Sequence, residues 1–305
     1  FNIFFIVILH LGIESIFYSL ILSDIVSFIV GITITNKYFK IYFSKEKALK
    51  YISFGNKFIF IGLFILFIDV SDRFFLKYFT DEATVGIYST NYRLASAMGL
   101  IISAFKFSWT PYFLNIADNS NNKNIISDIF TKYVLAGSFL FLFFGIFTEP
   151  IVTFKINGIS LLNEQYWSGT YIIPVIILSY FISGLVSNME VAPFFTNKTY
   201  YLLIVAAGGT IFNILFNILL IPRFGMLGAA WATTLSYLAM FIHIYILSQR
   251  IYKINYKWIT IFKIAIITIL IYCTYYIIRR QINPSPEGQV LIGIIIIIIT
   301  ILLFR

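Results

Sequence analysis

Nine long apolar stretches follow one another through almost the whole of this 305-residue sequence. A helix needs about 20 mostly apolar residues to cross roughly 30 Å of hydrocarbon at about 1.5 Å per residue. Because lipid offers the backbone no hydrogen-bond partner, each stretch should form a helix. The sequence therefore predicts an all-α polytopic membrane protein. The expected spans are residues 14–35, 52–70, 84–114, 130–148, 170–188, 200–221, 226–247, 258–278 and 288–304.

Composition narrows the classes of function that remain. Only 11% of the residues are charged and 60% are hydrophobic, whereas about a quarter of the residues of a soluble domain are charged. The single cysteine, Cys273, lies in an expected span, and the two histidines, His10 and His243, are far apart in the sequence. We therefore expect no disulfide, no metal site and no other cofactor. The net charge of +9 is spread over short loops, so it does not indicate nucleic-acid binding.

The basic residues predict how the chain is oriented, because loops on the cytoplasmic side of a membrane are richer in lysine and arginine. Six basic residues belong to one set of loops: Arg73, Lys77, Lys155, Arg223, Arg279 and Arg280. Fourteen lie in or beside the other set: Lys37, Lys40, Lys45, Lys47, Lys50, Lys57, Lys123, Lys132, Lys198, Arg250, Lys253, Lys257, Lys263 and Arg305. The span at 14–35 should therefore run inward, and the chain should be a multi-pass protein of the cytoplasmic (inner) membrane.

A weak internal repeat suggests how the helices are organised. Residues 8–29 align with residues 221–242 at an offset of 213, with six of 22 positions identical. Two parallel halves of six helices would place both copies at the ends of the halves. The chain begins in mid-hydrophobic sequence at Phe1, so we expect a piece of a longer protein. Its expected parts are the end of a first lobe with a cytoplasmic linker at 1–50, a second six-helix lobe at 51–250, and a helix pair at 251–305.

Three segments carry a resemblance to a known family. They are DVSDRFFLKYFTDEATVGIYSTNYRLAS at 69–96, FKFSWTPYFLNIA at 105–117 and NILFNILLIPRFGMLGAAWATTLSY at 213–237. The chain resembles the polysaccharide flippases of the multidrug/oligosaccharidyl-lipid/polysaccharide exporter superfamily, particularly the O-antigen and capsule types. The resemblance implies a transporter helical bundle of the kind found in multidrug and toxic compound exporters. Such proteins have fourteen helices, of which about nine would be present here.

The resemblance also implies a function. Proteins of this kind flip a polyprenyl-pyrophosphate-linked oligosaccharide across the cytoplasmic membrane by alternating access, for the biosynthesis of surface polysaccharide. The implied partners are this lipid-linked substrate, membrane lipids, and the polysaccharide polymerase with its chain-length machinery. No nucleic acid is expected as a partner.

Two cations in the span at 84–114 are candidate substrate-binding residues. Arg93 lies about nine residues, or roughly 14 Å, into the span, and a cation at that depth should face a cavity or a partner. Its guanidinium could bind the substrate pyrophosphate, or it could form a structural ion pair. Lys106 lies about 20 Å further along, and its azimuth differs from that of Arg93 by about 140°. It could line the cavity or reach the inner headgroups.

Four charged residues are candidates for a gate or a coupling-ion site. Asp69, Asp72 and Arg73 follow the span at 52–70, where helix capping and headgroup contact are the simpler interpretation. Asp24 lies in the middle of the span at 14–35, where a carboxylate is costly, and its partner is expected in another part of the protein. Glu190 is expected in a solvated cytoplasmic turn.

Asn213 and Asn217 are the remaining candidates for substrate binding. Their i, i+4 spacing places them on one helix face. Hydrogen bonding between helices is the simpler use of such a pair in a membrane, and contact with sugar is the alternative. Gly208 and Gly209, directly before them, would allow a neighbouring helix to approach closely.

Two other functions compete with the flippase. A cation-coupled multidrug exporter of the same superfamily would need an acidic cavity, which Arg93 and Lys106 disfavour. A membrane polysaccharide polymerase or glycosyltransferase would need a sizeable loop that carries catalytic groups, and the longest loops here have about fifteen to twenty residues. No nucleophile–base pattern or glycine-rich phosphate loop is present in the sequence. We therefore expect a transporter and not an enzyme.

Overall fold

The fold is described by a computed structural model, which covers residues 4–38, 43–282 and 284–303. Helices form at all nine expected segments. The long helices are α1 (Ser15–Thr35), α2 (Lys45–Phe79), α3 (Glu82–Asn115), α4 (Asn122–Thr153), α5 (Ile173–Met189), α7 (Tyr200–Ile251), α8 (Trp258–Ile282) and α9 (Pro286–Leu303). The short elements are η1 (Phe4–Ile8), η2 (Gly12–Glu14), η3 (Asn36–Tyr38), η4 (Glu164–Ile172), α6 (Val191–Phe195), β1 (Lys155–Ile156) and β2 (Ile159–Ser160).

Five helical segments among the described residues are long and apolar enough to span a membrane. They are Ser15–Thr35, Asn122–Thr153, Glu164–Phe195, Tyr200–Ile251 and Trp258–Ile282. The chain is thus a helical protein with several potential membrane spans, and the number nine stays a prediction. The helices α2 and α3 fall outside this set, and both carry charged residues along their length.

The chain divides into two compact units, residues 1–54 and residues 55–305. In the first unit, α1 leaves nearly all of its side chains exposed. These side chains are mostly apolar, as expected for a helix whose surroundings are lipid. The second unit contains the packed bundle, and everything described below belongs to it unless α1 is named.

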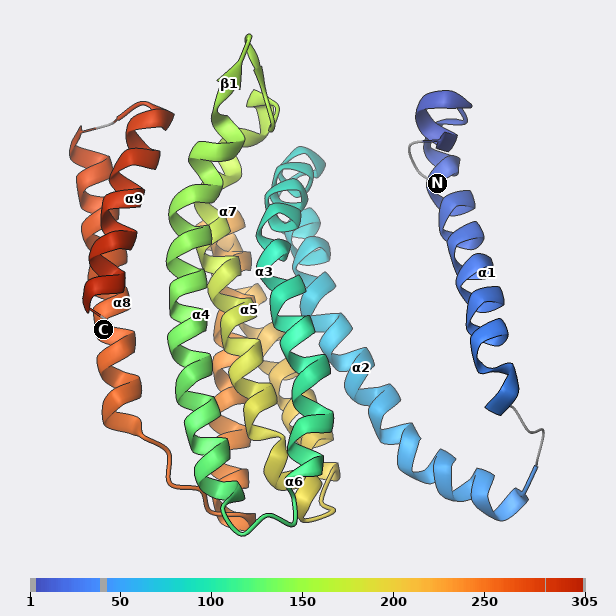
Figure 1. Cartoon of the computed structure of the whole chain (residues 1–305). Helices are drawn as coiled ribbons and strands as arrows, with labels where there is room; N and C mark the ends of the chain where they lie inside the picture. The colour runs from blue at the N-terminus through green and yellow to red at the C-terminus, as the bar shows by residue number, and fades with distance from the viewer. Residues whose placement is uncertain (1–3, 39–42, 283, 304–305) are drawn as a thin grey trace. The chain divides into compact units, whose positions relative to one another are not determined.

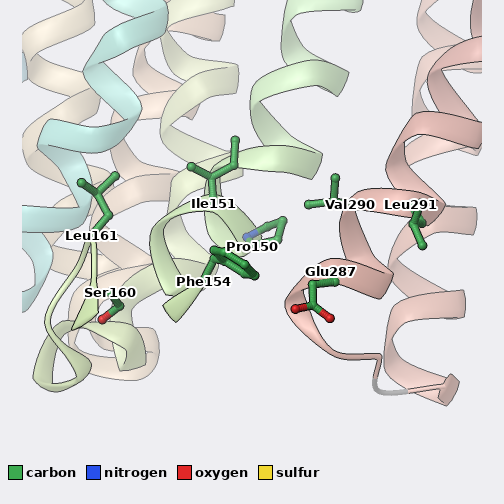
Figure 2. Close-up of a pocket in the computed structure, with 8 residues that line it drawn as sticks. All are labelled: Pro150, Ile151, Phe154, Ser160, Leu161, Glu287, Val290 and Leu291. Carbon is green, nitrogen blue, oxygen red and sulfur yellow. The ribbon is translucent and has the colours of Figure 1, made fainter. Parts of the chain in front are cut away.

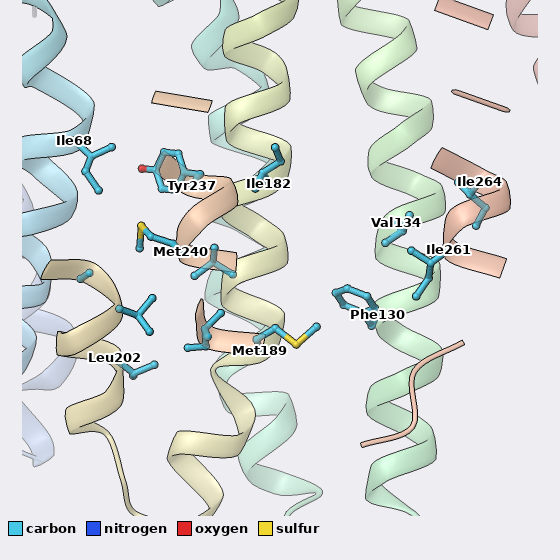
Figure 3. Close-up of a cluster of buried hydrophobic side chains, with 14 residues drawn as sticks. Ile68, Phe130, Val134, Ile182, Met189, Leu202, Tyr237, Met240, Ile261 and Ile264 are labelled. Atoms are coloured by element: carbon cyan, nitrogen blue, oxygen red, sulfur yellow. The ribbon is translucent and has the colours of Figure 1, made fainter. Parts of the chain in front are cut away.

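The helix α5 lies at the centre of the second unit. It packs against α3, α4 and α7, whereas α8 and α9 pack against α4 on the opposite side (Figure 1). A cluster of buried apolar side chains from α2, α4, α5, α7 and α8 fills the centre of the bundle, as Figure 3 shows for Ile68, Phe130 and Ile264. An ion pair fixes the C-terminal helices to α4, since Arg279 of α8 binds both carboxylate oxygens of Glu149.

The helix α2 is longer than the sequence indicated. It continues to Phe79, and Asp69, Asp72 and Arg73 lie inside it and not at its end. The next helix starts at once, because Asp81 caps α3 by accepting a hydrogen bond of 2.7 Å from the backbone N–H of Thr84. This bond stabilises the carboxylate and lowers the pKa of Asp81.

The element α7 combines two of the expected spans. Its helical conformation is interrupted at Gly225, whose φ of 54° favours glycine. The backbone segments on either side of Gly225 are closely packed, because a Cβ atom on Gly228 would lie 2.4 Å from the backbone oxygen of Leu220. The two parts of α7 also approach closely further along, since a Cβ on Gly209 would lie 2.3 Å from Cγ of Met240. The expected close packing is confirmed at Gly209, whereas a Cβ on Gly208 would make only an ordinary contact, 3.5 Å from Nδ1 of His243.

A candidate site inside the helical bundle

The C-terminal part of α2 carries an aspartate that has no exposed surface. One carboxylate oxygen of Asp72 accepts a hydrogen bond of 2.5 Å from the hydroxyl of Tyr88 on α3. The other oxygen lies 3.2 Å from a guanidinium nitrogen of Arg73. Asp72 therefore joins α2 to α3 inside the protein. The interpretation of Asp72 as a headgroup contact is wrong, because the side chain reaches no surface.

Arg73 is held over aromatic rings. Its guanidinium carbon lies 4.5 Å from the ring centre of Tyr92 and 5.9 Å from that of Tyr88. The same guanidinium donates a hydrogen bond of 2.7 Å to the backbone oxygen of Asp69. With 27% of its side chain exposed, Arg73 is oriented by these contacts and still accessible to a ligand.

Asp69 connects α2 to the second part of α7. Its Oδ1 accepts a hydrogen bond of 2.8 Å from the hydroxyl of Tyr237. Tyr237 is a buried core residue, whereas Asp69 is only half-buried. Asp69 also interacts electrostatically with Lys106 of α3, so it lies between two groups that stabilise its charge.

Lys106 points toward α5. Its ammonium lies 3.5 Å from the hydroxyl of Ser183, and it interacts electrostatically with Glu190 and Asp69. Glu190 is half-buried at the end of α5 and lies among buried neighbours. The expectation that Glu190 is solvated is wrong, because its side chain is only partly exposed and its neighbours Met189 and Val191 are buried.

These side chains form an arrangement that we call the charged column: Arg73, Asp69, Lys106 and Glu190. In this order their charges alternate in sign, from the C-terminal part of α2 through α3 to the C-terminal end of α5. Each cation interacts with at least one of the carboxylates. Charged groups buried between helices are costly unless they are paired, and they often mark functional sites, so the column is the strongest candidate site in the described part of the chain.

Asn213 and Asn217 lie on the same helix face and are both fully buried. Oδ1 of Asn213 accepts hydrogen bonds from the hydroxyl of Ser71 at 2.8 Å and from Nδ2 of Asn217 at 2.9 Å. The predicted hydrogen bond between helices is therefore present, from α2 to α7. Because neither asparagine reaches a surface, contact with sugar stays a prediction that this arrangement does not favour.

Two of the predicted residues stand apart from the column. Arg93 is exposed on α3, and Asp24 is exposed on α1. No ion pair of either side chain is found among the described residues. Arg93 and Lys106 lie on different faces of α3, as their spacing predicts. The roles of Arg93 as a pyrophosphate ligand and of Asp24 as a gate or coupling residue stay predictions.

A large pocket lies elsewhere in the described part of the chain. It has a volume of about 1030 Å³ and is formed by the end of α4, the hairpin strand β2 and the start of α9 (Figure 2). Its walls are mostly apolar, for example Ile151, Phe154 and Leu291, and its charged residue is Glu287. A carboxylate would repel a pyrophosphate, so this pocket does not suit the head of the expected substrate.

Comparison with known proteins places the chain in a family. The profile of a family described as "polysaccharide biosynthesis protein" matches residues 3–156. An uncharacterized membrane protein of Methanocaldococcus jannaschii is 40% identical over 65 residues, which are 20% of this chain and 13% of that relative. This chain therefore matches only a small part of that protein's length. No solved structure shows significant similarity. The chain belongs to the polysaccharide biosynthesis protein family, and it is a helical membrane protein with several potential spans.

Proposed function

We propose that this protein is a transporter that flips a polyprenyl-pyrophosphate-linked oligosaccharide across the cytoplasmic membrane by alternating access. The observation that carries the proposal is the charged column inside a membrane protein of a polysaccharide biosynthesis family. A transported head with phosphates and many hydroxyls needs polar and cationic groups within the membrane. Arg73 and Lys106 are such groups, and the column holds them among partners that a phosphate could replace.

The column also suggests how such a head is accommodated. Phosphate oxygens are better partners for Arg73 and Lys106 than distant carboxylates, because they accept short charge-assisted hydrogen bonds. When no substrate is bound, Asp69 and Glu190 compensate the charge of Lys106 and limit the cost of keeping a cation in the membrane. We assign the phosphate contact to Lys106 and Arg73, with Arg93 as a further contact, and the compensating role to Asp69 and Glu190.

The multidrug exporter is a second candidate, and one observation favours it. The column contains two carboxylates, Asp69 and Glu190, and Asp72 lies close to it, so the bundle is less basic than Arg93 and Lys106 alone suggested. Each of these carboxylates has a tyrosine or a cation of the protein as partner. A cationic drug would have to compete with these partners, so the flippase remains our first proposal. We propose no enzymatic activity.

A deletion experiment separates these candidates. In cells that depend on this protein for surface polysaccharide, its loss should abolish surface polysaccharide and cause the lipid-linked oligosaccharide to accumulate in the inner leaflet. Expression of the Lys106→Gln variant should leave this defect in place. Lowered resistance to cationic drugs, with normal surface polysaccharide, would instead identify a drug exporter. Loss of the lipid-linked oligosaccharide itself would indicate an enzyme of its synthesis.

A further inference from the structure

One end of the bundle carries a second pocket that the charged column does not include. It has a volume of about 300 Å³ and is lined by Lys123 and Asn124 at the start of α4 and by Lys253 and Asn255 in the segment between α7 and α8. All four side chains are exposed and polar. The pocket thus presents two ammonium groups and two amides to one small space.

The walls of this pocket are fixed by hydrogen bonds. The hydroxyl of Tyr252 donates a bond of 2.8 Å to Oδ1 of Asn122, and its ring lies 4.7 Å from the ammonium of Lys123. The hydroxyl of Ser127 donates a bond of 2.9 Å to the backbone oxygen of Asn255. These contacts tie the segment between α7 and α8 to the first turns of α4. The pocket is therefore preformed and needs little ordering when a ligand binds.

The local charge selects an anionic ligand. Among the described residues, neither Lys123 nor Lys253 forms an ion pair with a carboxylate. Asp128, one turn further along α4, is already held by Lys257 at 2.7 Å. The N-terminal end of α4 adds a partial positive charge to the same space. Phosphate oxygens match such a set of ammonium, amide and backbone N–H donors.

An apolar surface next to the pocket indicates where the phosphate comes from. The helix α8 begins at Trp258, directly after the pocket segment, and exposes Ile259, Phe262 and Ile266 along one side. Their spacing places them on neighbouring turns of a single helix face. In the sequence, Tyr256 and Trp258 lie between Asn255 of the pocket and Ile259 of this face; their ring centres are 6.0 Å apart, and both pack against the apolar core of the bundle. Such rings are common at a membrane interface. A free phosphate would leave this surface unused, whereas acyl chains would cover it.

We propose that this pocket binds the phosphate of an anionic phospholipid, with the acyl chains along the exposed side of α8. We call it the lipid-phosphate site. It is distinct from the charged column, and it does not depend on the proposed transport function. Its role is to anchor this end of the bundle at the headgroup level of an anionic leaflet.

The test is lipid binding to the purified full chain in neutral detergent, titrated with phosphatidylglycerol, phosphatidylcholine or inorganic phosphate. Native mass spectrometry counts the bound lipid, and thermal unfolding gives the stabilisation. We expect phosphatidylglycerol to bind at least tenfold more tightly than phosphatidylcholine. In the Lys123→Gln/Lys253→Gln variant, the ratio of the affinities for phosphatidylglycerol and phosphatidylcholine should fall about tenfold. Each basic group near an anionic lipid raises the affinity several-fold. In Phe262→Ser, phosphatidylglycerol should bind more weakly while its preference over phosphatidylcholine remains.

The matched control is Lys198→Gln/Arg250→Gln, which removes the same charge from other positions predicted on the same side. It should keep the preference within about twofold. If the preference for phosphatidylglycerol falls equally in both double variants, the proposed site is wrong, because the net charge of the protein alone would then explain binding. Equal affinity for both lipids would overturn it too. Competition by inorganic phosphate at the concentration of the lipid would contradict the assignment to a lipid. Unfolding without added lipid shows whether each variant is folded.

Discussion

The hydroxyl of Tyr237 donates a hydrogen bond of 2.8 Å to Oδ1 of Asp69, across a separation of 168 residues in the sequence. This bond joins the second part of α7 to α2 and orients a carboxylate that also interacts with Lys106. Because the bond lies within the charged column, the geometry of the column depends on Tyr237, although tyrosine itself carries no charge.

Replacement of Tyr237 by phenylalanine should therefore disturb the column without removing a charge. We expect a loss of about 1 kcal/mol in the free energy of unfolding, because polar contacts between membrane helices contribute about that much, and a clear loss of export. Tyr245→Phe is the control, since it removes a hydroxyl for which no hydrogen bond is found among the described residues. Equal effects of the two substitutions on export and on thermal unfolding would contradict a specific role of the Tyr237–Asp69 bond.

Lys106 and Glu190 give a prediction about charge. Lys106→Gln should reduce export by about ten- to a hundredfold, as expected for one charge-assisted hydrogen bond of about 1.5–3 kcal/mol. Lys106→Arg should keep part of the activity because it preserves the cation. Glu190→Gln should also reduce export, because it removes a carboxylate that compensates Lys106.

The control for this series is Glu164→Gln, which removes an exposed carboxylate paired with Lys155. Such surface pairs contribute little, so export should remain normal. Protein levels are measured by immunoblot and export by surface polysaccharide. If Lys106→Gln and Glu190→Gln are made at normal levels and export normally, the charged column has no part in transport.

The sequence predicted the position of the helices well, because runs of about 20 apolar residues leave few alternatives in a membrane protein. It misplaced the end of α2, because the polar triplet Asp69, Asp72 and Arg73 is typical of a helix end at a membrane surface. Local sequence could not show that Asp72 is buried, since the partner that satisfies it, Tyr88, is on another helix.

The candidate site was harder to predict than the helices. The depth of Lys106 in a span makes it a candidate from sequence alone, whereas Glu190 follows the end of the span at 170–188 and is therefore expected in a solvated turn. The ion pair of Glu149 with Arg279 was not predicted either, because 130 residues separate the partners. A signal was present in each case, namely an ionisable residue close to a long apolar segment, but sequence alone does not identify its partner.

The tight turn within α7 gives a prediction about stability. A Cβ atom on Gly228 would lie 2.4 Å from the backbone oxygen of Leu220, so Gly228→Ala should lower the free energy of unfolding by about 1–3 kcal/mol. Gly86→Ala on α3 is the control. Nothing lies within 4 Å of a Cβ atom there, so this substitution should be neutral or stabilising. An unfolding temperature that is lower for Gly86→Ala than for Gly228→Ala would contradict this reading of the geometry.

The orientation of the chain follows from the basic residues and is tested by labelling. Single cysteines at Lys45 and Ser160, in a Cys273→Ala background, should react with an impermeant reagent from opposite sides of the membrane. In intact cells we expect labelling at position 160 and none at position 45. Labelling at position 45 before the cells are opened would reverse the assignment.

The central claim is tested most directly by flipping in liposomes. The full-length protein is reconstituted with a fluorescent polyprenyl-pyrophosphate oligosaccharide, and the fraction that becomes accessible to an added quencher on the opposite leaflet is followed over time. The account predicts movement that exceeds protein-free liposomes, falls about ten- to a hundredfold in Lys106→Gln and Arg93→Ala, and is partly kept in Arg93→Lys. Movement no faster than in protein-free liposomes, or the same rate in all variants, would contradict it.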